Sequence, residues 1–353
     1  MTSEKFVVTL TADFYDSAGA PKYRDLGLSL LQEHPQIEQR VFQEHRKIIG
    51  ADQIRAAQGV IVLTPSVTAE SVSQAKDLLV IARFGVGYDA VDVDACTRAD
   101  VLVTITTGAV DRPVAEATIG WMIALSHHVL TKDRLVRTGQ WDERSKYMGC
   151  ELRDRTLGVI GFGGIARKTV ELLRGFGMRQ PLAFDPFASE ETAAMSGVRL
   201  VSLEELLSGA DFVSIHCPLT EQTRGLIGRR ELAMMKPEAY LLNTARGGII
   251  DEEALYDALK NRRIAGAALD CFAEEPVTAP NRFSDLENVL LAPHSIAWTN
   301  ELFRDIGRAA CQVMVDLSLG EKPRGVLNPE LFERASFREK WERLRVRDME
   351  GNL

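Results

Sequence analysis

The sequence has few cysteines, five in 353 residues, and their spacing excludes two structural roles. Their number is odd, and no two of them stand at the CxxC spacing of a zinc finger or a redox motif. Small secreted domains depend on paired cysteines, and structural zinc sites depend on closely spaced ones. We therefore expect no disulfide framework and no metal site, and we expect a reducing compartment such as the cytoplasm.

A basic excess and a long apolar run are also missing. Lys and Arg number 42 against 50 Asp and Glu, and a net charge of -8 opposes binding along nucleic acid. No stretch reaches the roughly 18 apolar residues that a membrane span needs. The first residues lack the basic and apolar regions of a signal peptide. We expect neither a nucleic-acid nor a membrane partner, and the length predicts about two domains.

Short apolar runs alternate with helix-length polar stretches through the first third of the chain. The runs Phe6–Leu10, Gly59–Leu63, Leu78–Ala82 and Val101–Ile105 are typical of strands. This alternation predicts a parallel α/β sheet. Apolar residues at helical spacing follow Pro113 and predict one long helix over Val114–Arg137.

A second α/β run begins near residue 156, and a helix over Asn300–Leu319 follows it, with Gly320 as a stop signal. Six strands are predicted in this run, enough for a dinucleotide-binding sheet. They are Thr156–Ile160, Pro181–Phe184, Phe212–Ile215, Tyr240–Leu242, Ala267–Leu269 and Val289–Leu291.

A glycine motif follows the first of these strands and opens a predicted helix, which is the context of a phosphate-binding turn. Gly161 permits the tight turn, Gly163 lets backbone approach a pyrophosphate, and Ala166 replaces the usual third glycine. Asp185 ends the next strand, where a carboxylate accepts hydrogen bonds from ribose hydroxyls and repels a 2′-phosphate. We predict NAD binding in preference to NADP. The alternative is a structural glycine turn with a solvent-facing Asp185.

Polar segments follow three later strands, at the edge where open α/β sheets bind ligands: residues 243–248, 270–276 and 293–299. With these segments the chain resembles the D-isomer-specific 2-hydroxyacid dehydrogenase family, from about Gly59 to Pro329. The resemblance also covers residues 85–89, 113–118 and 216–223. It implies an NAD-dependent oxidoreductase that interconverts a small D-2-hydroxy acid and its 2-keto acid.

Three residues in these segments supply what hydride transfer at a carbinol carbon requires. His294 fits the role of acid or base for the hydroxyl proton, because imidazole groups as a class exchange protons near neutral pH. Glu275 orients the far side of the imidazole ring and stabilises its charged form, and Arg246 holds carboxylate and keto oxygens with paired donors. The resemblance implies the same roles. Taken singly, each has an ordinary structural explanation, as a loop, helix-terminus or turn residue, so the prediction rests on the trio.

The resemblance implies further contacts for both ligands. Backbone N–H groups of Val86 and Gly87 would bind the substrate carboxylate, together with Arg246 and His294. Cys217 would be a wall of the cofactor site and not a nucleophile. The implied cofactor residues, besides those of the glycine motif and Asp185, are Thr118, Phe162, Gly164, Ile165, Cys217, Pro218, Thr223, Thr244, Ala245, Asp270 and Ala297.

The order of these segments predicts two α/β domains of Rossmann-like or flavodoxin-like type with parallel sheets. An NAD-binding domain, residues 107–296, is inserted into a substrate domain made of residues 1–106 and 297–330. Residues 331–353 form a charged extension, expected as a solvated or partner-contacting helix. The long helix, with Trp121 and Trp141 nearby, favours a homodimer.

Several alternatives stay open. A relative acting on another small anion, such as phosphite, and an NAD(H)-binding sensor or corepressor have the same fold. Glyoxylate, hydroxypyruvate, sugar-derived hydroxy acids and phosphoglycerate are all possible substrates. Arg83 and Arg112 either read a second anionic group or pair with surface carboxylates, which we favour. Trp298 either shapes the pocket or is a surface aromatic.

Overall fold

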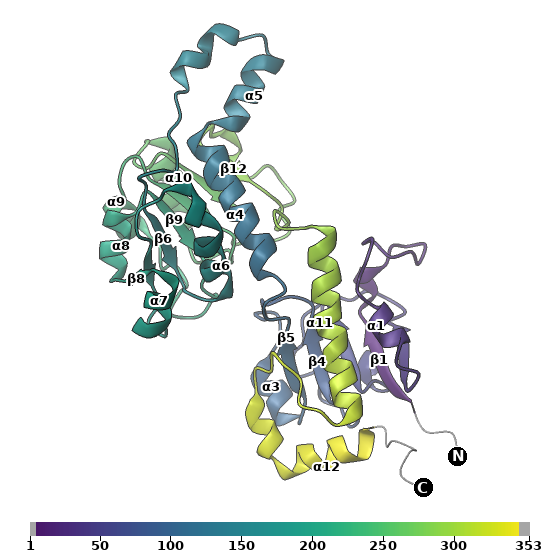
Figure 1. Ribbon diagram of the computed structural model, residues 1–353. Coiled ribbons are helices and arrows are strands. Elements are labelled where there is room, and N and C mark those ends of the chain that lie inside the picture. Colours follow the sequence, from purple (N-terminus) through teal and green to yellow (C-terminus); the bar gives the residue numbers. More distant parts are fainter. Residues whose placement is uncertain (1–4, 346–353) are drawn as a thin grey trace. The chain divides into compact units, whose positions relative to one another are not determined.

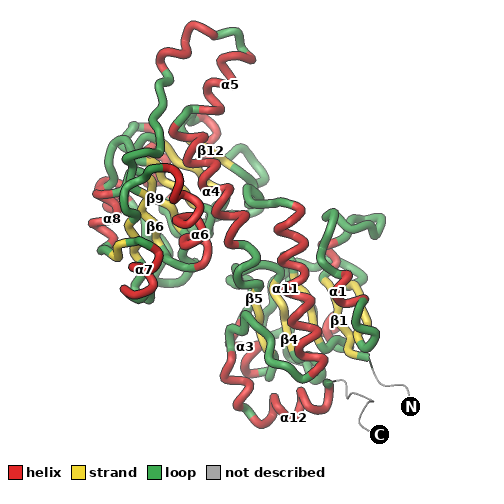
Figure 2. Tube along the Cα trace, in the orientation of Figure 1, coloured by secondary structure: helices red, strands yellow, loops and turns green. Residues whose placement is uncertain are grey.

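A computed structural model describes residues 5–345, and the chain divides into two compact units (Figure 1). Unit 1 takes in the chain up to Val110 and again from Thr299, and unit 2 is Asp111–Trp298. Each unit holds its own parallel sheet with helices against it (Figure 2). Two parallel-sheet α/β domains were predicted, and this fold class is confirmed.

The sheet of unit 1 has five parallel strands in the order β2-β1-β3-β4-β5, the doubly wound order typical of flavodoxin-like folds. β1 and β3 are buried throughout, which is why their sequences are continuous apolar runs. β2 was not predicted, because only its first residue is buried and the remainder is polar or exposed. The strands are β1 (Phe6–Leu10), β2 (Ile37–Val41), β3 (Gly59–Val62), β4 (Val80–Arg83) and β5 (Leu102–Ile105).

Helix α11 (Asn300–Leu319) returns the chain to unit 1 and packs against β4 and β5. Its predicted bounds are confirmed: the Thr299 hydroxyl accepts the N–H of Leu302 at 3.0 Å, and Gly320 ends the helix at φ 83°. The other helices of unit 1 are η1 (Ala12–Phe14), α1 (Ser29–Gln32), α2 (Ala51–Ile54), α3 (Val93–Arg98), η5 (Pro329–Glu333) and α12 (Ala335–Leu344).

The segment after α11 contains a helix with most of its charged side chains exposed, as expected, but one side of that helix is fastened to unit 1. The Asn328 side chain accepts the N–H of Val103 in β5 at 2.9 Å. In α12, Phe337 is fully buried, and Lys340 Nζ donates to the carbonyl of Asp100 at 2.9 Å. The burial of Phe337 and these hydrogen bonds hold the segment on unit 1 although it carries many charged residues. The rest of the expected extension, residues 346–353, and residues 1–4 lie outside the described residues.

The sheet of unit 2 has seven parallel strands in the order β12-β11-β10-β9-β6-β7-β8. Six of them, from β11 to β8, follow the Rossmann order with β12 added at one edge, and the strand order reverses between β6 and β9. β8 was not predicted because it has two residues, of which Arg199 is exposed. The strands are β6 (Leu157–Ile160), β7 (Leu182–Phe184), β8 (Arg199–Leu200), β9 (Phe212–Ile215), β10 (Tyr240–Asn243), β11 (Gly266–Leu269) and β12 (Val289–Leu291).

The single long helix predicted over Val114–Arg137 is wrong, because the chain forms α4 (Asp111–Ser126) and α5 (Val129–Arg137). His128 between them has a left-handed backbone, φ 54°, which no α-helix can accommodate. Apolar spacing continues across the break, so periodicity alone does not reveal it. The remaining helices of unit 2 are η2 (Trp141–Lys146), α6 (Gly164–Leu172), η3 (Leu173–Phe176), α7 (Glu190–Ser196), α8 (Leu203–Gly209), α9 (Arg229–Met234), α10 (Glu252–Lys260) and η4 (Arg282–Asp285).

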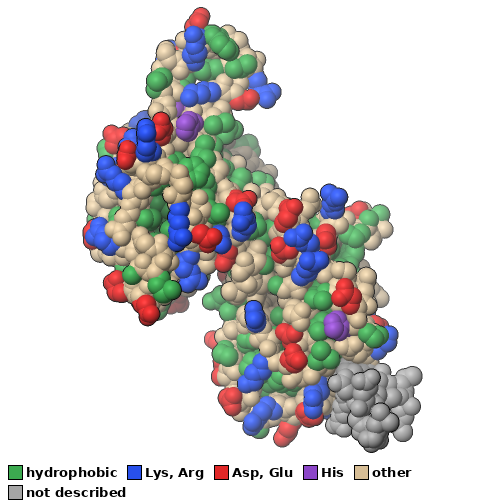
Figure 3. All heavy atoms as spheres, viewed as in Figure 1, with side chains coloured by type: hydrophobic (Ala, Val, Ile, Leu, Met, Phe, Trp, Pro, Cys, Tyr) green, Lys and Arg blue, Asp and Glu red, His purple; other side chains and the backbone are tan. Residues whose placement is uncertain are grey.

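Two observations bear on partners. Within residues 5–345, no helix combines the length and the apolar character needed to cross a membrane. On the face that Figure 3 shows, basic and acidic side chains are interspersed over both units.

Candidate active site

The glycine turn lies between β6 and α6, at the point where the strand order of unit 2 reverses. Gly161 has φ 89°, and a Cβ built there would lie 2.7 Å from the backbone nitrogen of Cys217, the second residue after β9. Only glycine fits both the conformation and the space. Gly163 precedes α6 as its N-cap, so the first N–H groups of that helix have no acceptor within the helix. This is the geometry of an anion cradle.

Asp185 follows β7, and hydrogen bonds hold its carboxylate beside the glycine turn. One oxygen accepts the N–H of Phe162 at 2.7 Å, and the other accepts the N–H of Phe187 at 2.8 Å. Each oxygen keeps a second lone pair for another donor. The ring of Phe162 is buried, so this residue offers its backbone at the turn.

The predicted adenosine-side residues follow β9 or lie on α4. Burial raises the pKa of the Cys217 thiol to about 11, so it is not a thiolate nucleophile at neutral pH. Thr223 closes the loop by donating from its hydroxyl to the carbonyl of Pro218 at 2.6 Å. Thr118 is buried on α4, which packs against α6.

The loop after β10 is shaped by a residue that the sequence reasoning missed. Asn243 accepts the N–H of Ala245 at 3.0 Å and donates to the carbonyl of Arg246 at 2.8 Å, folding the loop back on itself. The hydroxyl of Thr244 is shielded from solvent and has no hydrogen-bond partner among the described residues. An orphaned buried hydroxyl fits the predicted contact with a cofactor amide. The signal in the sequence was an Asn at a strand end, a residue type that forms such turns.

Gly247 brings this loop against the loop after β11. A Cβ on Gly247 would lie 1.8 Å from the carbonyl oxygen of Phe272, so no other residue fits. The close approach places half-buried Arg246 next to the segment that carries Glu275. Arg246 Nη1 donates to the carbonyl of Ala245 at 2.6 Å, which orients the guanidinium group.

Glu275 and His294 form a hydrogen-bonded pair at the ends of the neighbouring strands β11 and β12. His294 Nδ1 and Glu275 Oε2 are 2.8 Å apart, and Glu275 Oε1 accepts the N–H of Phe272 at 2.8 Å. Burial raises the pKa of Glu275, but the bonds from His294 and Phe272 outweigh it and leave that pKa below its usual value. The carboxylate is therefore ionised. The side chains are 33% and 43% exposed, so the pair is open to a substrate.

The backbone of His294 is held in an unfavourable conformation. Its φ is 51°, a left-handed value that costs a residue with a Cβ about 1–3 kcal/mol. Asp270 offsets this cost, because its Oδ1 accepts the next two N–H groups, those of Ser295 at 2.8 Å and Ile296 at 3.1 Å. Burial raises the pKa of Asp270, and these two bonds oppose that rise.

Cys271 is a second residue that the sequence reasoning missed. Its thiol is buried and donates to the carbonyl of Ala245 at 3.4 Å. Ligand atoms of Cys271, Glu275 and His294 all lie within 4.8 Å of one another. The sequence shows Cys271 in the same loop as Glu275, but it does not show that the thiol points toward the pair.

The remaining predicted substrate residues, Val86 and Gly87, follow β4 in unit 1. The turn begins at Gly85, φ 134°, and Arg83 holds it by donating from Nε to the carbonyl of Gly87 at 2.8 Å and from Nη1 to the carbonyl of Phe84. Because the carbonyl groups of Phe84 and Gly87 are bonded to Arg83, the backbone N–H groups of the turn can bind an acceptor from outside it. Arg83 thus supports the turn.

Of three further residues considered in the sequence, Arg112 and Trp298 lie at the surface and Ala297 is buried. Arg112 pairs with Glu116 at 2.7 Å on an exposed turn of α4, which is the surface pairing we favoured. Trp298 is 54% exposed, and its role in a pocket stays a prediction. Ala297 beside it is buried.

Comparisons with known proteins agree on one family. The family model described as D-isomer specific 2-hydroxyacid dehydrogenase, NAD binding domain, matches residues 119–295. The chain is 35% identical over 313 residues to a glyoxylate reductase of Korarchaeum cryptofilum, covering 87% of this chain and 94% of that protein. It is 38% identical over 271 residues to a D-3-phosphoglycerate dehydrogenase of Archaeoglobus fulgidus, covering 77% of this chain and 51% of that protein.

The chain thus spans about half the length of the phosphoglycerate dehydrogenase that it matches. Among solved structures, a glyoxylate reductase from Paecilomyes thermophila superposes with a TM-score of 0.79 at 26% identity, covering 94% of this chain and 100% of that one. Sequence and fold comparisons agree with the resemblance noted from the motifs. The chain belongs to the D-isomer-specific 2-hydroxyacid dehydrogenase family.

Proposed function

We propose that this protein interconverts a small D-2-hydroxy acid and its 2-keto acid, with NAD(H) as the hydride carrier. The observation that carries the proposal is the bonded pair of His294 and Glu275, 2.8 Å apart, at the strand edge that also bears Arg246. Family membership supports the reaction class.

The residues of unit 2 fit a nicotinamide dinucleotide. The glycine turn offers backbone N–H groups to a pyrophosphate, Asp185 offers lone pairs to ribose hydroxyls, and the orphaned hydroxyl of Thr244 suits the carboxamide. When bound, NAD(H) accepts or supplies the hydride. We assign the other predicted cofactor residues to the walls of this site.

His294 moves the proton in this proposal. In keto-acid reduction, its Nε2 donates a proton to the oxygen that becomes the hydroxyl, and in oxidation it takes that proton back. Glu275 fixes the ring through Nδ1 and stabilises the imidazolium. Arg246 holds the carboxylate and keto oxygens with its paired donors. Val86 and Gly87 add backbone N–H groups for the carboxylate.

The absorbance of reduced nicotinamide tests the reaction. Purified protein is incubated with NADH and, in turn, with glyoxylate, hydroxypyruvate, phosphohydroxypyruvate and a sugar-derived keto acid. Oxidation of NADH by at least one of them supports the proposal and ranks the substrates. Saturable NADH binding without turnover on any acid contradicts it and favours a sensor or corepressor.

The carboxylate of Asp185 underlies our proposal that NAD is preferred over NADP. Asp185→Asn keeps an acceptor oxygen for the turn but removes the charge that repels a 2′-phosphate. We expect the ratio of kcat/KM for NADH to that for NADPH to fall about tenfold, which is one pKa unit's worth of interaction. Steady-state kinetics with both cofactors measure the ratio. Asp251→Asn, at the N-cap of α10, is the matched control and leaves it unchanged. An unchanged ratio in Asp185→Asn contradicts the assignment.

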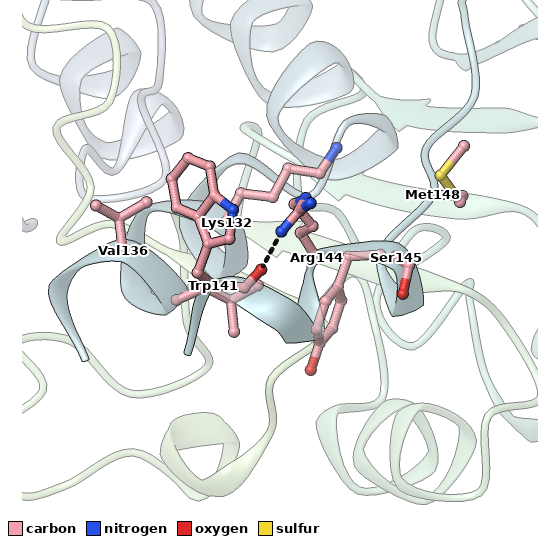
Figure 4. A pocket seen from close by; sticks show the side chains of 8 residues that line it. Lys132, Val136, Trp141, Arg144, Ser145 and Met148 are labelled. Atoms are coloured by element: carbon pink, nitrogen blue, oxygen red, sulfur yellow. Dashed lines mark hydrogen bonds between the residues drawn. The ribbon is translucent and has the colours of Figure 1, made fainter. Parts of the chain in front are cut away.

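We also propose a homodimer formed through the arm made of α5 and η2, residues 129–148. Trp121, named beside Trp141 in the sequence, is buried in the core of unit 2, whereas Trp141 is 61% and Met148 80% exposed. They line a hollow of about 520 Å³ with Val136 and Arg144 (Figure 4), on a segment that extends from unit 2 (Figure 1). Exposed aromatic and Met side chains of this kind are enriched in protein interfaces.

The mass in solution, measured by light scattering after size-exclusion chromatography, tests whether the arm forms a dimer interface. We expect the wild-type protein to elute at twice the chain mass of 39.1 kDa. Replacing both Trp141→Ser and Met148→Ser removes the apolar contacts and should shift the mass to that of one chain. Met195→Ser, at another exposed Met of unit 2, is the control. A dimer that survives the double substitution excludes the arm as the interface.

The cysteines are consistent with a reducing compartment, and we propose the cytoplasm. All five are free thiols, and three of them are buried. Burial raises the pKa of Cys96 and that of Cys311 to about 12, so both remain protonated.

A further inference from the structure

We propose that Cys271, Glu275 and His294 form a binding site for Zn²⁺ whose occupation switches off the proposed acid–base pair. The inference rests on the proposed function for its effect on turnover, but the site itself rests on geometry. Among residues 5–345, this is the one group of three His, Cys, Asp or Glu side chains found close enough to share an ion.

The three ligand atoms are near the arrangement that a tetrahedral ion requires. They lie within 4.8 Å of one another, and the Glu275 and His294 atoms are 2.8 Å apart. Zinc bonds of about 2.0–2.3 Å at the tetrahedral angle place ligand atoms about 3.3–3.6 Å apart. Small rotations of Glu275 and His294 provide the adjustment, because both side chains are partly exposed.

The chemistry of the donors selects the ion. A thiolate, an imidazole nitrogen and a carboxylate oxygen suit Zn²⁺, whereas Mg²⁺ and Ca²⁺ prefer oxygen ligands only. Cys271 is 2% exposed and forms the floor of the site, behind the more exposed pair. On binding, its thiol loses its proton and gives up the bond to the carbonyl of Ala245.

Zinc at this position removes the catalytic proton path. Coordination by His294 Nδ1 replaces the proton that this nitrogen shares with Glu275, and Glu275 turns from orienting the ring to holding the ion. A dication bound to the ring also disfavours protonation at Nε2. Three protein ligands leave the fourth position open to water or to the substrate carboxylate. Inhibition is therefore reversible and depends on the thiol.

Titration of zinc chloride into the full-length protein, in metal-free buffer, tests the effect during NADH turnover. We expect activity to fall at least tenfold, to return with EDTA, and to be insensitive to the same concentration of magnesium chloride. Relative to its own activity without metal, Cys271→Ala should need at least tenfold more zinc than the wild-type protein for the same fractional loss. Cys271→Val fills the buried volume if the Ala variant is unstable. Cys150→Ala, at a partly exposed thiol of unit 2, keeps the wild-type zinc sensitivity.

Cobalt absorption gives a readout without turnover. Co²⁺ bound to a thiolate produces a sulfur-to-metal charge-transfer band, expected in the wild-type protein and absent in Cys271→Ala and Cys271→Val. If the cobalt band is present but no keto acid is turned over, the result supports the metal site and contradicts the proposed function. Turnover with equal zinc sensitivity in the wild-type protein and the Cys271 variants overturns the metal site, as does absence of the cobalt band.

Discussion

Replacing His294 with asparagine is expected to lower kcat for keto-acid reduction by roughly 10²–10⁴-fold, the usual contribution of a positioned acid or base. The asparagine fills a similar volume and can hydrogen-bond Glu275, but it cannot deliver a proton at neutral pH. Asparagine also tolerates the left-handed backbone at this position, φ 51°, so the fold should be kept. Stopped-flow and steady-state absorbance of NADH measure the loss.

The control for this variant is His127→Asn, at an exposed position in the turn that follows α4. It changes the same residue type in the same unit and should leave kcat unchanged. NADH affinity, measured by fluorescence titration, should be equal in both variants and in the wild-type protein. A loss below about tenfold in His294→Asn, with NADH bound normally, contradicts its assignment as the proton donor.

The second large effect is expected at Arg246, where lysine should lower kcat/KM for the keto acid by about 10²–10³-fold, as removal of a transition-state donor does. Lysine retains the positive charge but lacks the planar fork that holds two oxygens at once. The bond from Nη1 to the carbonyl of Ala245, 2.6 Å, fixes the direction of that fork, and a lysine cannot reproduce it. The effect should fall on the keto acid and not on the cofactor.

Steady-state kinetics with each substrate varied in turn separate the two effects. Arg174→Lys, an exposed arginine in η3, is the matched control with unchanged kinetics. A rise in KM for NADH with an unchanged KM for the keto acid contradicts the proposal and places Arg246 in the cofactor site.

The sequence predicted the strands that are apolar runs, including the edge strands β5 and β12, and missed the two edge strands without such a run. The strands β1, β3, β6 and β9 are buried throughout, and their apolar runs predict them from the sequence. The edge strands β2 and β8 are polar or very short, so no pattern distinguishes them from loops. The helix breaks at His128 because of that residue's left-handed backbone conformation, which the spacing of apolar residues does not predict.

At the candidate site, the sequence named the side chains of the proposed acid–base pair but not the contacts that position them. The pair of Glu275 and His294 came from motifs, and the structure brings them to 2.8 Å. The contact of Gly247 with Phe272 joins loops that follow different strands, so it depends on how β10 and β11 pair. The direction of the Cys271 thiol depends on the same pairing. Such contacts are set by tertiary structure, which no local pattern encodes.

The discontinuity of unit 1 has a consequence for the order of events during synthesis. Its five strands leave the ribosome first, but α11 covers β4 and β5, and Asn328 completes the backbone bonds of β5 only after unit 2 has been translated. Unit 2 is continuous in sequence and can finish folding while the nascent N-terminal sheet still waits for its cover. The apolar strands within residues 6–105 therefore stay partly uncovered until α11 and Asn328 have been translated.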